Sequence, residues 1–417
     1  MKFIRKNSES TRILENTFFL SLFQASNYLI PLLTVPYLVR VVGVENFGVI
    51  MFAQSLMNYL IILTDYGFNL SATRDISINR NNIPKVSHIY TSVLSARILI
   101  LLLSMFVLIL IVETFDIFKK DSIVFYFFFG IVVGNAIFPI WLFQGLEQMK
   151  YITFINFLGK TLYLISIITF INAPEDYIFV PIIHSLSSIL SGLLAIFSAR
   201  LFLGVSMRCI SLRDVLDQLV MTRFYFASSV QSNILSSSGV FILGLFHSKE
   251  IVGYYSAIEK IVKAIIALYY PITQALYPYS SKILKKNKQL GKETIRRVGA
   301  LIILSAALLV ALLVFLSPRI LQMLYGHEFL GHSLLLNLML VWFLNGLINN
   351  FIGIQFLLGL GKSRIYARSF FLATITTLFL FILLTPILSY YGIAIGILSG
   401  ELVLTAVMIA YIKRRNI

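Results

Sequence analysis

The sequence predicts an all-α membrane protein whose chain crosses a lipid bilayer twelve times. Hydrophobic residues make up 58% of the chain, charged residues 12%, and the mean hydropathy is +0.88. A water-facing surface on 417 residues would need far more charge. Each apolar run has about 19 residues or more, which matches a hydrocarbon core of ~30 Å. The runs cover residues 17–42, 47–70, 91–112, 122–143, 152–172, 177–199, 223–246, 252–280, 298–317, 333–358, 367–385 and 391–411.

The runs are predicted as helices because lipid offers the backbone no hydrogen-bond partner, and barrel strands are about half as long and alternate in polarity. Prolines interrupt three of these helices: Pro31 and Pro36 in the first, Pro139 in the fourth, and Pro271 and Pro278 in the eighth. Such prolines break the backbone ladder. We expect bends there, which serve either as moving parts or as fixed kinks.

The distribution of Lys and Arg predicts the orientation of the chain. With the N-terminus in the cytoplasm, the cytoplasmic segments hold 25 basic residues and the opposite loops hold 4. Seven of them lie between Lys282 and Arg297. Basic residues resist translocation, so both termini are predicted to be cytoplasmic.

Charge and cysteine content exclude several classes of protein. The net charge of +16 is a topology signal, and without a soluble domain it predicts contact with anionic lipid headgroups and no nucleic-acid partner. The single cysteine, Cys209, excludes an intramolecular disulfide. We find no catalytic dyad, nucleotide-binding loop or metal-ligand spacing, so the sequence predicts neither an enzyme nor a cofactor or metal. The first apolar run is longer than a cleavable signal and is expected to remain as a helix.

The two halves of the chain show a weak internal repeat. Glu45-x-x-Gly48 opens the second run and Glu250-x-x-Gly253 opens the eighth, and residues 140–150 align with residues 354–364. Six helices separate each pair, so the repeat is parallel, about an axis along the membrane normal. We expect two six-helix lobes at 1–200 and 223–417, joined by a cytoplasmic linker at 201–222.

The linker carries a helix start signal. Ser211 and Asp214 form a capping box, followed by apolar residues at helical spacing. One interpretation is an amphipathic helix lying in the membrane plane, and the other is an extension of the seventh helix into the cytoplasm.

Charged side chains within the predicted helices point to a functional site, because a charge at mid-bilayer costs roughly 2.5 to 3.5 kcal/mol. Lys263 lies about 16 Å into the eighth run, near the midplane. Lys260 shares its face, and Glu259 stands four residues before Lys263. A local ion pair of Glu259 with Lys263 leaves Lys260 unexplained. We therefore favour a water-filled, substrate-facing cavity for this face.

Other buried charges extend this hypothesis. Glu401, at the centre of the twelfth run, either carries a proton or cation during transport or pairs with a lysine. Arg97 and Lys160 lie inside the third and fifth runs. The deep cations, Arg97, Lys160, Lys260 and Lys263, outnumber the deep carboxylates, Glu259 and Glu401. The predicted cavity is net positive, which suits a diphosphate or an acidic sugar better than a cationic drug.

Two segments carry a family resemblance: Asp65–Ser77 (DYGFNLSATRDIS) and Trp141–Thr153 (WLFQGLEQMKYIT). Here the sequence resembles the Wzx-type O-antigen and polysaccharide repeat-unit flippases of the multidrug, oligosaccharidyl-lipid and polysaccharide exporter superfamily. The resemblance implies a MATE-like fold of two lobes around a cavity, and alternating access. It also implies movement of an undecaprenyl-diphosphate-linked oligosaccharide across the bacterial inner membrane.

The resemblance also implies roles for individual residues and partners. By helix position, Arg97, Lys160, Lys260 and Lys263 match cavity cations that meet the substrate. The cytoplasmic turn at 66–68, with Asp65 before it and Arg74 and Asp75 after it, would either gate entry or receive the diphosphate, although helix capping and topology charge also explain it. The expected partners are membrane lipids, a polysaccharide polymerase and a chain-length regulator.

Three other functions compete with this hypothesis. A drug exporter or an exporter of another lipid-linked glycan would share the fold. A polysaccharide polymerase is also polytopic, but it carries a large periplasmic loop, and the longest predicted periplasmic connection here has about 15 residues. The sequence therefore favours a flippase.

Overall fold

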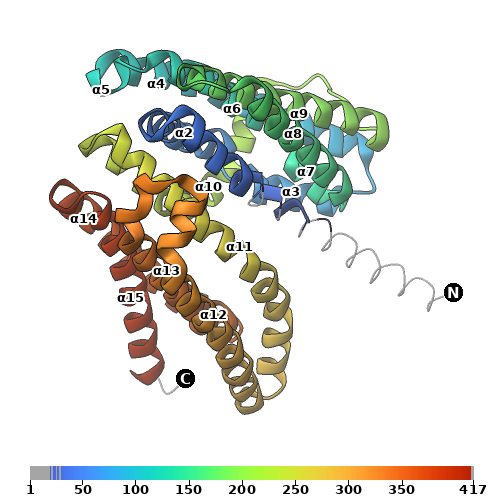
Figure 1. The fold of residues 1–417 in the computed structure, drawn as a ribbon. Helices are drawn as coiled ribbons and strands as arrows, with labels where there is room; N and C mark the ends of the chain where they lie inside the picture. The colour runs from blue at the N-terminus through green and yellow to red at the C-terminus, as the bar shows by residue number, and fades with distance from the viewer. Residues whose placement is uncertain (1–18, 20–21, 25, 28–29, 415–417) are drawn as a thin grey trace. The chain divides into compact units, whose positions relative to one another are not determined.

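In the computed structural model, the described residues are 19, 22–24, 26–27 and 30–414, apart from the side chains of 227–229 and 231–237 (Figure 1). All regular secondary structure among them is helical. By internal contacts the chain separates into two compact units, an N-terminal unit ending at Ser237 and a C-terminal unit starting at Ser238. Each unit is described by itself below.

The N-terminal unit consists of helices connected by short turns. After a helix at Ile30–Val42 come α2 (Val44–Asp65), α3 (Phe68–Asn79), α4 (Ile83–Thr114), α5 (Asp116–Lys119), α6 (Ser122–Ile137), α7 (Ile140–Gly145), α8 (Met149–Phe170), the 3₁₀ turn η1 (Pro174–Ile178), α9 (Phe179–Leu203) and most of α10 (Leu212–Phe246).

The C-terminal unit begins within α10 and is also helical. It continues with α11 (Lys249–Lys286), α12 (Lys288–Tyr325), the 3₁₀ turn η2 (His327–His332), α13 (Ser333–Asn349), the π-helical segment η3 (Asn350–Leu358), α14 (Ser363–Leu388) and α15 (Tyr390–Arg414).

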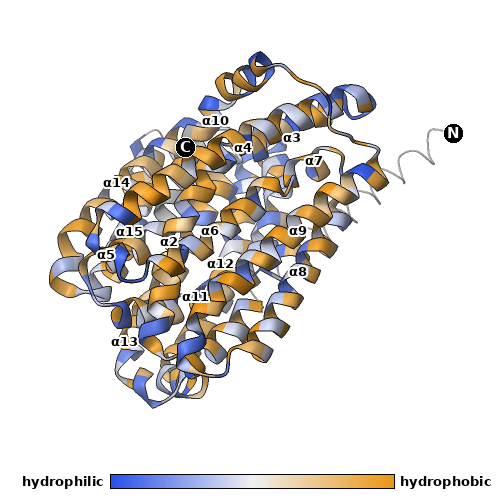
Figure 2. Cartoon of the chain, turned by 90° about the horizontal axis from the view of Figure 1, so that it is seen from above, coloured by the Kyte–Doolittle hydropathy of each residue, from blue (hydrophilic) through white to orange (hydrophobic). Residues whose placement is uncertain are grey.

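Within residues 30–414, nine helical segments are long and apolar enough to cross a bilayer. Long hydrophobic stretches are visible along most helices in Figure 2. On α12, large apolar side chains are exposed at spacings of three and four residues, namely Leu301, Leu304, Leu308, Leu312 and Phe315. This spacing places them on one face, which fits a helix surrounded by lipid. The prediction of a multi-pass, all-helical membrane protein is confirmed.

Three of the twelve predicted spans are not among these nine segments. The predicted first span, 17–42, falls partly outside the described residues, and its continuously described part forms the short apolar helix Ile30–Val42. The helices α10 and α11 have 35 and 38 residues, enough to span, but they are more polar than the other nine segments. The count of twelve stays a prediction.

The predicted linker is not a separate helix in the structure. The helix α10 starts at Leu212 and runs without a break to Phe246, so its first residues extend the helix that follows. The capping box is present: the Ser211 backbone N–H donates to Asp214 Oδ2 at 2.8 Å, and the Asp214 N–H donates to Ser211 Oγ at 3.2 Å. The Ser211 hydroxyl also donates to Asp214 Oδ2, at 2.7 Å, and this bond together with the one from the Ser211 backbone N–H holds the pKa of Asp214 below its usual value.

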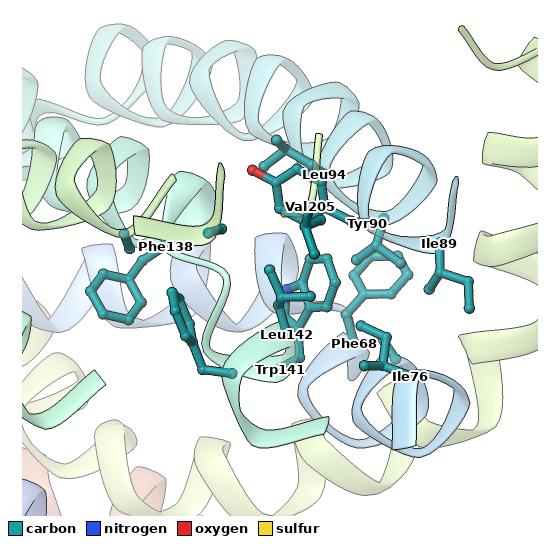
Figure 3. Close-up of a cluster of buried hydrophobic side chains, with 14 of the residues drawn as sticks. Phe68, Ile76, Ile89, Tyr90, Leu94, Phe138, Trp141, Leu142 and Val205 are labelled. Atoms are coloured by element: carbon teal, nitrogen blue, oxygen red, sulfur yellow. The ribbon is translucent and has the colours of Figure 1, made fainter. Parts of the chain in front are cut away.

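A buried apolar cluster holds α3, α4 and α7 together (Figure 3). Phe68 and Ile76 of α3, Tyr90 of α4, and Trp141 and Leu142 of α7 are each 2% exposed or less. Tyr90 and Trp141 have ring centroids 5.8 Å apart. Because α3 and α7 lie in the two family-like segments, this cluster packs those segments against each other.

Candidate functional site

Each unit contains an interrupted helix at the same ordinal position. In the N-terminal unit, helical structure stops at Ile137 and resumes at Ile140 after Phe138 and Pro139. In the C-terminal unit, α13 passes into the π-helical segment η3. These are the fourth and tenth predicted spans. Interrupted helices at matching positions in two halves commonly mark the binding region of a transporter, and π-segments often occur at functional sites.

A buried polar cluster surrounds the interruption in the N-terminal unit. The Arg97 guanidinium donates to the Phe138 carbonyl oxygen at 3.2 Å and to Asn135 Oδ1 at 3.0 Å. Its Nη2 also lies 3.5 Å from Asp65 Oδ1. Proline at 139 has no N–H, so the helix is open at this point and its carbonyls need other donors. Arg97 supplies one of these donors, to the Phe138 carbonyl oxygen.

The position of Arg97 differs from the sequence expectation of a cavity cation. Its side chain is only 2% exposed, and its charge is balanced by Asp65, which is 19% exposed. A charge enclosed and paired in this way is not available to a ligand without rearrangement. The structure thus brings together two residues that the sequence assigned separately to the cavity and to the cytoplasmic gate.

The predicted gate lies at a tight turn between α2 and α3. Tyr66 and Gly67 both have positive φ angles, 45° and 78°. The Tyr66 ring stacks on Phe226 of α10 at 4.6 Å, and a Cβ on Gly67 would lie 2.7 Å from the Phe226 backbone nitrogen. Only glycine fits such a close approach at this φ. The turn is therefore held against α10 within the same unit.

The other two gate candidates lie on α3. Arg74 is exposed, and its Nη1 donates to the hydroxyl of Tyr225 at 3.3 Å. Asp75 is half-buried beside it. These contacts join α3 to α10, so Arg74 has a structural partner as well as an exposed position.

Lys160 contacts the predicted first span. Its Nζ donates to Asn27 Oδ1, and Lys160 is half-buried on α8. Asn156, one turn earlier on the same helix, accepts a hydrogen bond from Ser26 at 3.2 Å. Lys160 therefore helps to attach the first helix to α8.

The two predicted cavity cations of α11, Lys263 and Lys260, differ in whether they form an ion pair. Lys263 Nζ lies 2.9 Å from Glu259 Oε2, so the predicted local ion pair is present. The Lys263 side chain is 32% exposed and that of Glu259 is 8% exposed. Lys260 makes no ion pair with any residue that the structure describes, and it is half-buried. Within the predicted eighth span, 252–280, Lys260 is thus the cation that no described carboxylate meets in an ion pair.

Glu401 of α15 sits in a polar group that spans α13 and α15. The Asn349 side-chain amide donates to Glu401 Oε2 at 2.5 Å and to the Glu401 backbone oxygen at 2.9 Å. Thr405 donates its hydroxyl to Asn349 Oδ1 at 2.6 Å. This arrangement orients the carboxylate without a cation among the described residues. Such a carboxylate can take up a proton or a small cation.

The same carboxylate lines a cavity of about 240 Å³ inside the C-terminal unit. The walls come from α11, α13, η3 and α15, and include Tyr269, Tyr270, Trp342, Asn350 and Glu401. Aromatic walls with a few converging polar groups are typical of a ligand site. No group of three or more His, Cys, Asp or Glu among the described residues is placed to hold a metal ion.

Sequence reasoning missed the amide side chains at both interrupted helices. Asn135 meets Arg97, Asn349 meets Glu401, and Gln355 of η3 donates to the Thr273 carbonyl oxygen of α11 at 2.8 Å. The available signal was the presence of uncharged amides in apolar runs, where they need internal partners. A search for formally charged residues alone does not find these uncharged amides.

Comparison with solved structures defines the class of fold. An inward-facing multidrug resistance MATE family transporter of the MOP superfamily matches with a TM-score of 0.71 at 14% identity, covering 93% of this chain and 94% of that chain. The lipid II flippase MurJ, in an inward closed conformation, matches with a TM-score of 0.67 at 13% identity, covering 96% and 87%. The protein is thus an all-helical, multi-pass membrane protein with a MATE-like fold.

Sequence comparison then gives the family. The profile of the "Polysaccharide biosynthesis protein" family matches residues 13–284, and the chain belongs to this family. A protein of Escherichia coli strain K12 named "Putative O-antigen transporter" is 29% identical over 413 residues, 99% of each chain. A protein of the same name from Shigella dysenteriae is 26% identical over 406 residues, 96% of this chain and 100% of that one.

Proposed function

We propose that the protein is a flippase that moves undecaprenyl-diphosphate-linked O-antigen repeat units from the cytoplasmic to the periplasmic leaflet of the bacterial inner membrane. The names of the Escherichia coli and Shigella relatives support the substrate class, and the fold shared with a lipid II flippase supports the mode of transport. A polymerase and a chain-length regulator would use the product. Alternating access of the two units would carry the substrate across.

The observation that carries the proposal is Lys260, a cation that forms no ion pair with any described residue. It directly follows Glu259 and precedes Lys263 by three residues, on a helix long enough to span the bilayer. An isolated ammonium at membrane depth is expensive unless water or an anion meets it. A diphosphate supplies that anion during transport and leaves afterward.

The proposal includes an orientation. Both termini and the segment 282–297 are cytoplasmic, because the seven basic residues of that segment oppose translocation. All seven are exposed around the turn between α11 and α12. Activity of a periplasmic reporter fused at Lys288 would contradict this orientation.

The proposal also includes ion coupling through Glu401. Its carboxylate accepts a hydrogen bond from Asn349 and lines the cavity. A proton or cation taken up there would therefore alter the contact between α13 and α15. The coupling would favour one conformation of the C-terminal unit over another.

A deletion strain tests the function. We expect lipid-linked single repeat units to accumulate on the cytoplasmic leaflet and surface polysaccharide to be lost. Complementation with Lys260→Gln should fail at normal protein abundance, whereas Lys260→Arg should restore part of the export because the charge remains. Lys286→Gln, an exposed site in the cytoplasmic turn, is the control and should export normally. Repeat units that reach the periplasm and stay unpolymerised in the deletion strain would instead identify a polymerase.

A further inference from the structure

The helix α11 presents a polar stripe, defined here as Lys263, Tyr270, Gln274, Tyr277 and Ser281. Their spacings of seven, four, three and four residues place them on one face of an α-helix. Tyr270 is 43% exposed and Tyr277 is 37% exposed. The Gln274 amide nitrogen donates to the Tyr270 hydroxyl at 2.6 Å, so the stripe is already partly ordered.

The polar stripe does not fit contact with lipid. About half a turn away, α11 exposes Leu268, Ile272 and Tyr279, which make a separate, more apolar face. The lipid-facing side of α12 likewise carries mainly large apolar residues. Exposed amide and ammonium groups in hydrocarbon are costly, so a helix with two such different exposed faces turns the polar one toward water or a ligand.

The chemistry of the stripe indicates which part of the substrate it meets. No charged residue occurs between Lys263 and Lys282, so the segment offers a phosphate no counter-charge. It offers tyrosine rings, hydroxyls and an amide, which suit an uncharged ligand rich in hydroxyl groups. The stripe from Lys263 to Tyr277 is about 21 Å long, room for several sugar rings in a row.

The cavity of the C-terminal unit adjoins this stripe. Tyr270 belongs to both, and Trp342 and Asn350 form other parts of the cavity wall. An aromatic ring beside an amide can pack against the apolar face of a sugar while donating to its hydroxyls. The cavity thus offers a side pocket for one sugar at the stripe.

We propose that the uncharged members of the polar stripe, Tyr270, Gln274, Tyr277 and Ser281, bind the oligosaccharide of the substrate together with the adjoining cavity, while Lys260 and Lys263 hold its diphosphate. This inference rests on the proposed flippase function and adds a division of labour along one helix. Recognition of sugar is assigned to uncharged groups, and recognition of the carrier is assigned to the two lysines.

The test separates the two halves of the substrate. The purified full-length protein in lipid nanodiscs is titrated with two probes: the oligosaccharide released by mild acid from lipid-linked units of the deletion strain, and farnesyl diphosphate. We expect the double variant Tyr270→Ala/Tyr277→Ala to weaken oligosaccharide binding at least tenfold and to leave farnesyl diphosphate binding unchanged. Lys260→Gln should do the reverse. Tyr279→Ala, an exposed tyrosine on the apolar face of the same helix, should change neither.

Two further results complete the design. Tyr270→Phe retains the ring and should keep most of the oligosaccharide affinity. If the tyrosines only packed α11, their replacement by alanine would not affect the two probes differently. Unchanged oligosaccharide binding in the double variant, or an equal loss of that binding in Tyr279→Ala, would refute the role of the polar stripe in binding sugar. If the wild type moves lipid-linked units but binds no free oligosaccharide, the sugar-binding role of the polar stripe is refuted and the flippase function stands. If it moves no such units in reconstituted vesicles, the proposed function fails.

Discussion

The replacement of Arg97 by leucine distinguishes the two roles that this residue can have. As a substrate cation, Arg97 would be dispensable for folding and required for transport. The structure instead shows it 2% exposed, with Asp65, Asn135 and Phe138 as its partners. Arg97→Leu should therefore destabilise the N-terminal unit first, and transport should fall because less folded protein is present.

The size of the effect follows from the contacts. Removing one partner of a buried ion pair costs roughly 3 to 5 kcal/mol, because the other charge stays buried without compensation. The carbonyl of Phe138 also loses one of its two donors and keeps the Ile140 backbone N–H. At about 2 to 4 °C per kcal/mol for a unit of this size, the melting temperature should fall by on the order of 10 °C.

A double-mutant cycle gives the refuting result. Asp65→Leu combined with Arg97→Leu removes both charges, so the double variant should be less destabilised than the sum of the two single variants. Melting is followed by size-exclusion fluorescence in detergent, and transport is measured at matched abundance. If Arg97→Leu melts like the wild type yet transports nothing, the structural role is refuted and Arg97 is a substrate group.

Two other predictions address coupling and packing. Glu401→Gln keeps the shape of the side chain beside Asn349 but cannot exchange a proton, so stimulation of transport by a pH gradient in proteoliposomes should vanish; a persisting gradient response would remove Glu401 from the coupling mechanism. Gly145→Ala should destabilise the protein by about 1 to 3 kcal/mol, because its Cβ would lie 2.7 Å from the Ile76 side chain and 2.9 Å from the Thr73 carbonyl oxygen. Gly331→Ala, with nothing within 4 Å, should melt like the wild type.

The sequence predicts the helices well where apolar runs are long. The predicted spans 91–112 and 391–411 lie inside α4 and α15, and the interruption at Pro139 is present. Helix ends extend beyond the predicted spans because α4 and α11 continue through polar residues that hydropathy does not count. Local ion pairs follow from spacing, as Glu259 and Lys263 show.

Contacts between distant segments were not predictable from spacing. Arg97 meets Asp65 and Asn135 only because α2, α4 and α6 pack together, and a single sequence contains no signal for that register. Asn349 and Glu401 are joined across 52 positions for the same reason. The tertiary structure therefore differs more from the predicted site contacts than from the predicted helices.

The turn at Tyr66 and Gly67 bears on how the protein is made. Its stacking partner, Phe226, and the Thr222 hydroxyl that bonds Ser71 at 3.0 Å are synthesised about 150 residues later. The ribosome must therefore reach α10 before the N-terminal unit can close. The 180 residues of the C-terminal unit follow Ser237, and their synthesis takes roughly 9 to 36 seconds at about 5 to 20 residues per second. During that interval a finished first half stays in the membrane beside a growing second half, a window in which a membrane chaperone or protease would meet it.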